Sequence, residues 1–190
     1  MGLFSLEHGK AVFAADFAFY GAAVLLLTLY LVFDGARSQG PALAAMAVAG
    51  LAAWSLIEYL LHRFVLHGLQ PFARWHAAHH ARPTALIGSP TIVSASGFAV
   101  LVFLPAWGLL GSLPLASALT LGIVAGYLAY AVIHHATHHW RAGSPWMLQR
   151  KRWHALHHRA GGTPGCYGVS SGLWDRVFGS TRAGEAMTRC

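Results

Sequence analysis

Residues 130–139 read Tyr-Ala-Val-Ile-His-His-Ala-Thr-His-His and close a long apolar stretch. Twelve of the thirteen histidines fall in this cluster and three others, and only His8 stands apart. Within the clusters histidines recur at i, i+3 and i+4, a spacing that puts imidazoles on one face of a helix. Converging imidazoles suit a transition metal, whereas a lone buried histidine usually only finds a hydrogen-bond partner. The clusters comprise His62 and His67; His76, His79 and His80; His134, His135, His138 and His139; and His154, His157 and His158.

Composition places these clusters in a membrane protein. Of 190 residues 56% are hydrophobic and 10% are charged, and the mean hydropathy is +0.50, which is high for a water-soluble globule. The net charge of +7 does not indicate nucleic-acid binding, because the basic residues flank apolar segments. Two cysteines, Cys166 and Cys190, are too few for a disulfide framework and lack metal-ligand spacing.

Four apolar segments are long enough to cross a bilayer. The first is also compatible with a signal peptide, but no small-residue cleavage site closes it, which favours a retained span. We expect an all-α, integral membrane four-helix bundle with a cytosolic helical cap that carries a histidine-rich dimetal centre, in one domain. The expected spans are about 11–33, 42–61, 92–110 and 115–137, with the cap formed by 62–91 and 138–190 of the single domain 1–190.

The distribution of lysine and arginine predicts the orientation. With four spans, the N-terminal lead, residues 62–91 and residues 138–190 share one side of the membrane, and that side carries twelve of the thirteen basic residues. The positive-inside rule makes it the cytoplasmic side, so both termini are expected in the cytoplasm. All four histidine clusters end on this side.

Glu58 is an acid inside the second span, where a carboxylate is costly without a partner. His62 follows four residues later on the same helical face. One interpretation is that Glu58 accepts a hydrogen bond from a metal-binding His62. The other is an interfacial acid that reaches the lipid headgroups.

The four clusters resemble the histidine boxes of the fatty acid hydroxylase and sterol desaturase superfamily, which are membrane di-iron oxygenases. The stretch Gly168-Val-Ser-Ser-Gly-Leu-Trp-Asp-Arg-Val-Phe-Gly179 resembles the tail of its fatty acid 2-hydroxylase branch. Two features depart from that branch: Ala131 and His135 stand where an acid and a tyrosine are usual, and only eight residues separate His67 from His76.

The resemblance implies two iron ions and a set of ten histidine ligands, with no catalytic residue beyond them. Four further residues, His135, His139, Glu58 and Asp175, are expected to support the ligands without binding metal. The ligands implied are His62, His67, His76, His79, His80, His134, His138, His154, His157 and His158.

The residues alone lead to similar chemistry. About ten nitrogen ligands exceed what one metal accepts, so two metals are implied. A structural zinc site normally uses cysteines or a closed set of four ligands, and a hydrolytic dizinc site usually has bridging carboxylates. Imidazole-rich iron with open positions can instead bind O2. Because zinc binds nitrogen sites more tightly than ferrous iron, zinc can replace iron in purified protein.

The expected enzyme is an O2-dependent hydroxylase that acts on a lipid acyl chain, because such a chain reaches a site in the membrane without leaving its own phase. Electrons are expected from an external donor, a cytochrome b5 or a ferredoxin, since we find no electron-carrier motif in the chain. The basic triplet Arg150-Lys151-Arg152 is read as a contact for anionic lipid or for an acidic donor. Alternatives are a sterol or lipid desaturase, a carotenoid ring hydroxylase, and a metal-binding or metal-transport membrane protein.

Overall fold

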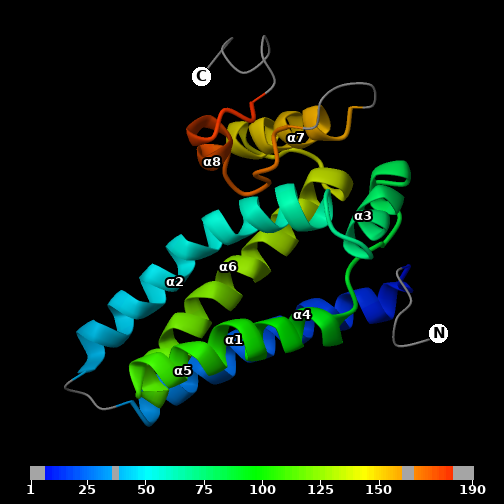
Figure 1. The fold of residues 1–190 in the computed structure, drawn as a ribbon. Coiled ribbons are helices and arrows are strands. Elements are labelled where there is room, and N and C mark those ends of the chain that lie inside the picture. Colours follow the sequence, from blue (N-terminus) through cyan, green and yellow to red (C-terminus); the bar gives the residue numbers. More distant parts are fainter. Residues whose placement is uncertain (1–6, 36–38, 160–164, 182–190) are drawn as a thin grey trace. The chain divides into compact units, whose positions relative to one another are not determined.

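The computed structural model describes residues 7–35, 39–159 and 165–181. Within these residues the chain is helical, with an isolated β-bridge between Glu7 and Ile87 and no strand, so the expected all-α fold is confirmed. The helices in chain order (Figure 1) are α1 (Lys10–Phe33), α2 (Gly40–Leu60), η2 (Leu61–Leu66), α3 (Phe72–Ala81), α4 (Thr91–Gly97), η3 (Phe98–Phe103), α5 (Leu104–Leu110), α6 (Leu113–His139), α7 (Pro145–His157) and α8 (Leu173–Val177).

Four helical segments of the described chain are long and apolar enough to cross a membrane, as the sequence predicts. Their bounds differ from the predicted ones by at most five residues. The largest difference is at the end of the second segment, where the π-helical turn η2 continues α2 beyond the predicted exit at Leu61. The segments are Lys10–Phe33, Gly40–Leu66, Thr91–Leu110 and Leu113–His139.

The chain divides into two compact units, and α2 and α6 contribute residues to both. We call Met1–Trp54 with Ala85–Leu128 the bundle unit, because it holds most of the apolar helical residues. We call Ser55–Thr84 with Ala129–Cys190 the histidine unit, because all four histidine clusters belong to it.

In the bundle unit, α2 and α6 cross at two glycines. A Cβ atom added to Gly122 would lie 2.0 Å from the carbonyl oxygen of Ala47, and one added to Gly50 would lie 2.2 Å from that of Leu119. Helices in a membrane gain little from the hydrophobic effect and associate through close backbone packing, which small residues permit. The two glycines therefore allow the closest approach of α2 and α6.

Helices α1 and α4 of the bundle unit are joined by polar side chains. The Thr91 hydroxyl donates to Asp16 Oδ1 at 2.6 Å, and the hydroxyls of Tyr20 and Ser94 lie 2.6 Å apart. The bond from Thr91 gives Asp16, an acid within the first span, the partner that an intramembrane carboxylate requires. The ribbons of α1 and α4 run side by side (Figure 1).

In the histidine unit, the π-helical turn η2 brings two histidines onto one face. His62 and His67 are five residues apart, which on an α-helix separates side chains by about 140°. A π-helical turn bonds residues five apart, so such side chains lie above one another. The rings of His62 and His67 are accordingly 5.4 Å apart, between centroids.

Residues 165–181, which include α8, pack on the end of α2 within the histidine unit. The indole Nε1 of Trp174 donates to Ser55 Oγ at 3.0 Å, and the Tyr59 and Ser180 hydroxyls lie 2.9 Å apart. The ring of Phe178 stacks on that of Tyr59 with 5.4 Å between centroids. This C-terminal segment therefore lies next to the turn that carries His62.

Candidate metal centre

The ten histidines implied by the resemblance form two groups of five in the histidine unit. Within each group, one ligand atom from every residue lies within 4.8 Å of the others. Helices α3 and α7 each contribute to both groups, so the groups are not built from separate segments of sequence. The first group comprises His62, His67, His76, His80 and His157, and the second comprises His79, His134, His138, His154 and His158.

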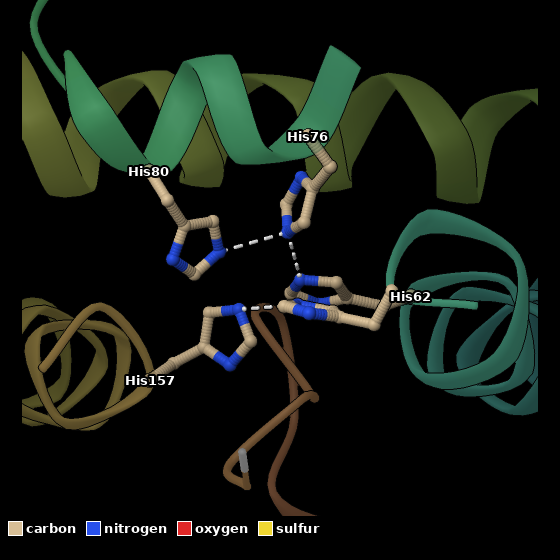
Figure 2. A group of neighbouring side chains, drawn as sticks. His62, His76, His80 and His157 are labelled. Carbon is tan, nitrogen blue, oxygen red and sulfur yellow. Dashed lines mark hydrogen bonds between the residues drawn. The ribbon is translucent and has the colours of Figure 1, made fainter. Parts of the chain in front are cut away.

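The first group points its Nε2 atoms inward. Nε2 of His76 lies 2.9 Å from Nε2 of His62 and 3.0 Å from Nε2 of His80. Nε2 of His67 lies 3.1 Å from that of His157. Figure 2 shows His76 and His80 reaching from α3 toward His62 on η2 and His157 on α7. Three separate helices thus direct imidazole nitrogens to one point.

The second group is built mainly from the ends of α6 and α7. Nε2 of His154 lies 2.8 Å from Nε2 of His138, and the ring centroids of His79 and His134 are 4.7 Å apart. His158 closes the group, with 4.9 Å between its ring centroid and that of His138. The spacing i, i+4 on α6 selects His134 and His138, and leaves His135 and His139 outside both groups.

The two groups adjoin each other. The rings of His80, from the first group, and His158, from the second, stack with 4.1 Å between centroids and 12° between planes. Two ions held in these groups would therefore be neighbours, without any residue belonging to both groups.

The nitrogen spacing fits a metal with ligands at right angles. Two nitrogens bound at about 2.1 Å lie about 3.0 Å apart when they subtend a right angle, and about 3.4 Å apart in a tetrahedron. The Nε2 separations of 2.8 to 3.1 Å match the first value. Each group could therefore hold one ion through several of its nitrogens.

Burial keeps these imidazoles neutral, as metal binding requires. Desolvation, aided by neighbouring imidazoles, lowers the pKa of His79 to about 3 and those of His80 and His158 to about 4. The same causes lower the pKa values of His76 and His154 well below the usual range. The lone pairs of these rings are therefore available at neutral pH.

His79 carries the clearest mark of a metal ligand. Its side chain is 5% exposed, and neither ring nitrogen has a hydrogen-bond partner among the described residues. A buried polar group without a partner costs about 1–3 kcal/mol, so natural proteins rarely retain one unless it has another role. A bound cation would satisfy the ring.

Two histidines of the first group are oriented by backbone carbonyls. Nδ1 of His62 lies 2.5 Å from the carbonyl oxygen of Tyr167, and Nδ1 of His157 lies 2.9 Å from that of Gly165. A carbonyl only accepts, so each Nδ1 must carry the proton and each Nε2 presents a lone pair. The lone pair of His62 Nε2 therefore points into the first group.

Glu58 and Asp175 are both buried, but neither bonds directly to a histidine. Glu58 Oε1 accepts from the backbone N–H groups of Val169 and Ser170, at 2.7 and 2.9 Å. His62 Nδ1 donates to the carbonyl oxygen of Tyr167 and not to Glu58. Glu58 is therefore connected to His62 only indirectly, through the backbone of the C-terminal segment. Asp175 accepts from the N–H groups of residues 167 and 168.

The basic triplet does not present three charges to a partner. Arg150 is 5% exposed, with its guanidinium 5.9 Å from the Trp153 ring. Nζ of Lys151 donates to the carbonyl oxygen of Thr137 at 2.8 Å, near the end of α6. The interpretation of 150–152 as one binding surface is therefore wrong for Arg150, because α7 turns that residue inward.

His135 and His139 stack on each other with 4.3 Å between ring centroids. Their predicted role in supporting the ligands stays a prediction. The part of the site that the sequence did not indicate is the carbonyl pair of Gly165 and Tyr167, because backbone acceptors leave no residue-type signal.

Comparison with known proteins connects this geometry to a family. A sequence model described as fatty acid hydroxylase matches residues 47–180. A dihydroceramide fatty acyl 2-hydroxylase of Arabidopsis thaliana, FAH2, is 32% identical over 154 residues, which cover 74% of this chain and 62% of the relative. The ceramide very long chain fatty acid hydroxylase SCS7 of Saccharomyces cerevisiae is 34% identical over 152 residues, covering 69% of this chain and 36% of the relative.

The human fatty acid 2-hydroxylase is 30% identical over 145 residues, covering 68% of this chain and 37% of that protein. The chain thus spans less than two thirds of the length of these curated relatives. A solved structure titled full length scs7p, with only its hydroxylase domain visible, matches 92% of this chain and 67% of its own, with a TM-score of 0.74 and 24% identity. That likeness shows a shared fold.

Proposed function

Because the chain belongs to the fatty acid hydroxylase family, we propose that it is a membrane oxygenase that hydroxylates a lipid acyl chain, with the ten grouped histidines as ligands of two iron ions. One observation carries the proposal. Two adjoining groups of five imidazole nitrogens meet in the histidine unit, and neither group includes a carboxylate or a thiolate among the described residues.

The ligand chemistry supports iron and O2. Hydrolytic dimetal sites usually share carboxylates, and structural zinc sites close with four ligands, whereas each group here offers five nitrogens. Bound ferrous iron would supply O2 activation. The protein's part is to hold the rings neutral, aim their Nε2 lone pairs inward and keep bulk water away from the buried ligands.

The overall reaction requires an external reductant. One oxygen atom enters a C–H bond, and the other leaves as water with two electrons and two protons. We propose that a cytochrome b5 or a ferredoxin supplies these two electrons, because neither the substrate nor O2 provides them.

A membrane-soluble substrate suits the bundle unit. Leu26, Leu101 and Leu109 expose 64%, 77% and 88% of their side-chain surface on helices that are apolar enough to cross a bilayer, as lipid-facing residues do. The relatives are named for fatty acyl and ceramide substrates, which supports an acyl chain here. We propose cytoplasmic N- and C-termini from the distribution of basic residues.

The test uses membranes that contain the full chain, a reductant with its donor protein, and isotopically labelled O2. Mass spectrometry of the extracted lipids should find acyl chains with one labelled hydroxyl oxygen, in amounts that depend on the protein. New double bonds without label would instead identify a desaturase. Metal accumulation without any lipid oxidation would identify a metal-binding or transport protein and refute the proposal.

A further inference from the structure

Residues 165–170 connect the ligand histidines to two buried acids. On one side, the carbonyl oxygens of Gly165 and Tyr167 accept from Nδ1 of His157 and His62. Both of these histidines belong to the first group. The position of the loop backbone therefore decides where two of that group's five rings point.

The other side of the loop is held by the N–H groups of four successive residues. Those of residues 167 and 168 donate to the two carboxylate oxygens of Asp175 at 2.8 and 2.7 Å. Those of residues 169 and 170 donate to Glu58 Oε1 at 2.7 and 2.9 Å. Hydrogen bonds from N–H groups to carboxylates are about twice as strong as neutral ones. The two acids thus fix four successive N–H groups in the middle and at the end of the loop.

Both carboxylates are buried, which costs free energy of solvation. Asp175 is 0% exposed and Glu58 is 3% exposed, and they come from α8 and α2. Side-chain hydroxyls add to their shells, since Ser180 Oγ donates to Asp175 and Ser170 Oγ donates to Glu58. The buried guanidinium of Arg150 interacts electrostatically with both acids. Buried carboxylates are stable only when their oxygens are hydrogen-bonded, as those of Glu58 and Asp175 are here.

The loop backbone is closely packed around Gly168. A Cβ atom on Gly168 would lie 1.9 Å from the carbonyl oxygen of Ser171 and 3.0 Å from Asp175 Oδ2. Cys166, which is flanked by the two accepting carbonyls, has φ of 58°, a left-handed value that costs a non-glycine residue about 1–2 kcal/mol. A conformation of this kind persists only where its surroundings enforce it.

The second group has no equivalent support among the described residues. Nδ1 of His154 and both ring nitrogens of His79 and His158 lack a hydrogen-bond partner there. The two groups therefore differ in how their ligands are held, although each offers five nitrogens.

We propose that Glu58 and Asp175 are positioning residues for the first group: by holding residues 165–170 they keep two carbonyls against His62 and His157, and so set metal affinity at the first group alone. The inference rests on the proposed function, in that it takes the histidines as ligands. A carbonyl that accepts from Nδ1 fixes the ring and raises the basicity of Nε2, and loss of such partners typically weakens metal binding by about 10–100-fold.

The experiment compares Glu58→Gln and Asp175→Asn with the matched control Asp16→Asn. Asp16 is a half-buried acid of the first span that accepts from one hydroxyl, that of Thr91, and it belongs to the bundle unit. Each purified full-length variant is loaded with two equivalents of ferrous iron, or of cobalt as a spectroscopic probe, and titrated with a chelator. Both test variants should release one equivalent at about 10–100-fold lower chelator concentration, while Asp16→Asn releases metal like the parent protein.

Double variants identify the affected group. Combining Asp175→Asn with His79→Ala, in the second group, should weaken both equivalents. Combining it with His157→Ala should weaken only the equivalent of the first group and leave that of the second group as in the parent protein. The milder Ser170→Ala, which removes one hydroxyl donor to Glu58, serves if the acid variants do not fold, and it should weaken the same equivalent by a smaller factor.

Equal weakening of both equivalents would show a general structural role and overturn the proposal, as would unchanged affinity in the folded variants. These results are distinct from failure of the proposed function. A parent protein that binds two metals but hydroxylates no lipid would refute the hydroxylase assignment and leave the positioning result readable, while a parent protein that binds fewer than two metals would overturn both.

Discussion

Removing a single histidine should remove a single metal. His79→Ala takes one of five nitrogens from the second group, and His157→Ala takes one from the first. Because no residue belongs to both groups, each variant should keep the other ion. His8→Ala is the control, since His8 lies in the bundle unit and outside the four clusters.

The expected magnitude follows from the ligand number. Structural metal sites bind with about 10–16 kcal/mol, so one ligand of five contributes about 2–3 kcal/mol, equivalent to about 30–200-fold in affinity. His79 adds no hydrogen bond in the described structure, so its loss should act mainly through the metal. His157 also loses its bond to the carbonyl oxygen of Gly165.

The assay is metal content by mass spectrometry after dialysis against a chelator at a concentration that the parent protein withstands. We expect about one equivalent in His79→Ala and in His157→Ala, and two in the parent and in His8→Ala. Lipid hydroxylation should be lost in both histidine variants. Two equivalents retained in either variant, with the fold intact, would refute the ligand assignment.

Three further predictions concern the backbone, the pH and the metal. Gly122→Ala places a methyl 2.0 Å from the carbonyl oxygen of Ala47 and should lower the free energy of unfolding by about 1–3 kcal/mol, measured by thermal unfolding in detergent. The control Gly21→Ala, whose methyl meets nothing within 4 Å, should not lower the free energy of unfolding. In metal-free protein the pKa of His79 is about 3, against about 6.5 in the unfolded chain, so the unfolded chain binds a proton more readily. The contribution of His79 to the free energy of unfolding should therefore be full above pH 6.5 and fall toward pH 4. A thermal unfolding midpoint that rises on acidification would contradict this. Removing metal with a chelator should abolish lipid hydroxylation, and ferrous iron but not zinc should restore it; recovery with zinc would exclude O2 chemistry at this centre.

The elements that the sequence predicted well are those with a strong periodic signal. The apolar run that ends in residues 130–139 predicted both a span and the face that carries His134 and His138. The resemblance favoured these two over His135 and His139 as ligands, and the structure places them together in the second group. Only the position of α6 against α7 decides which rings meet His154.

The exit of the second span was predicted five residues early. Leu61 precedes a histidine and an arginine, which reads as the end of an apolar helix, yet the chain continues as a π-helical turn to Leu66. A π-helical turn leaves no compositional signal that differs from an α-helix. The spacing His62-x4-His67 was the available clue, because five residues suit a π-helical turn better than an α-helical one.

Glu58 was recognised as unusual, but its partner was not. The i, i+4 rule considers only residues on the same helix, and so it pointed to His62. The actual partners, Val169 and Ser170, lie more than a hundred residues away and bond through backbone N–H groups. Long-range backbone contacts of this kind depend on the packed C-terminal segment rather than on any local pattern.

Helix α3 supplies His76 and His80 to the first group and His79 to the second. About one turn of α3 therefore carries ligands for both proposed ions, and its geometry limits how far apart the two ions can lie. A change that unwinds α3, such as a proline placed within this turn, should therefore loosen both proposed ions at once.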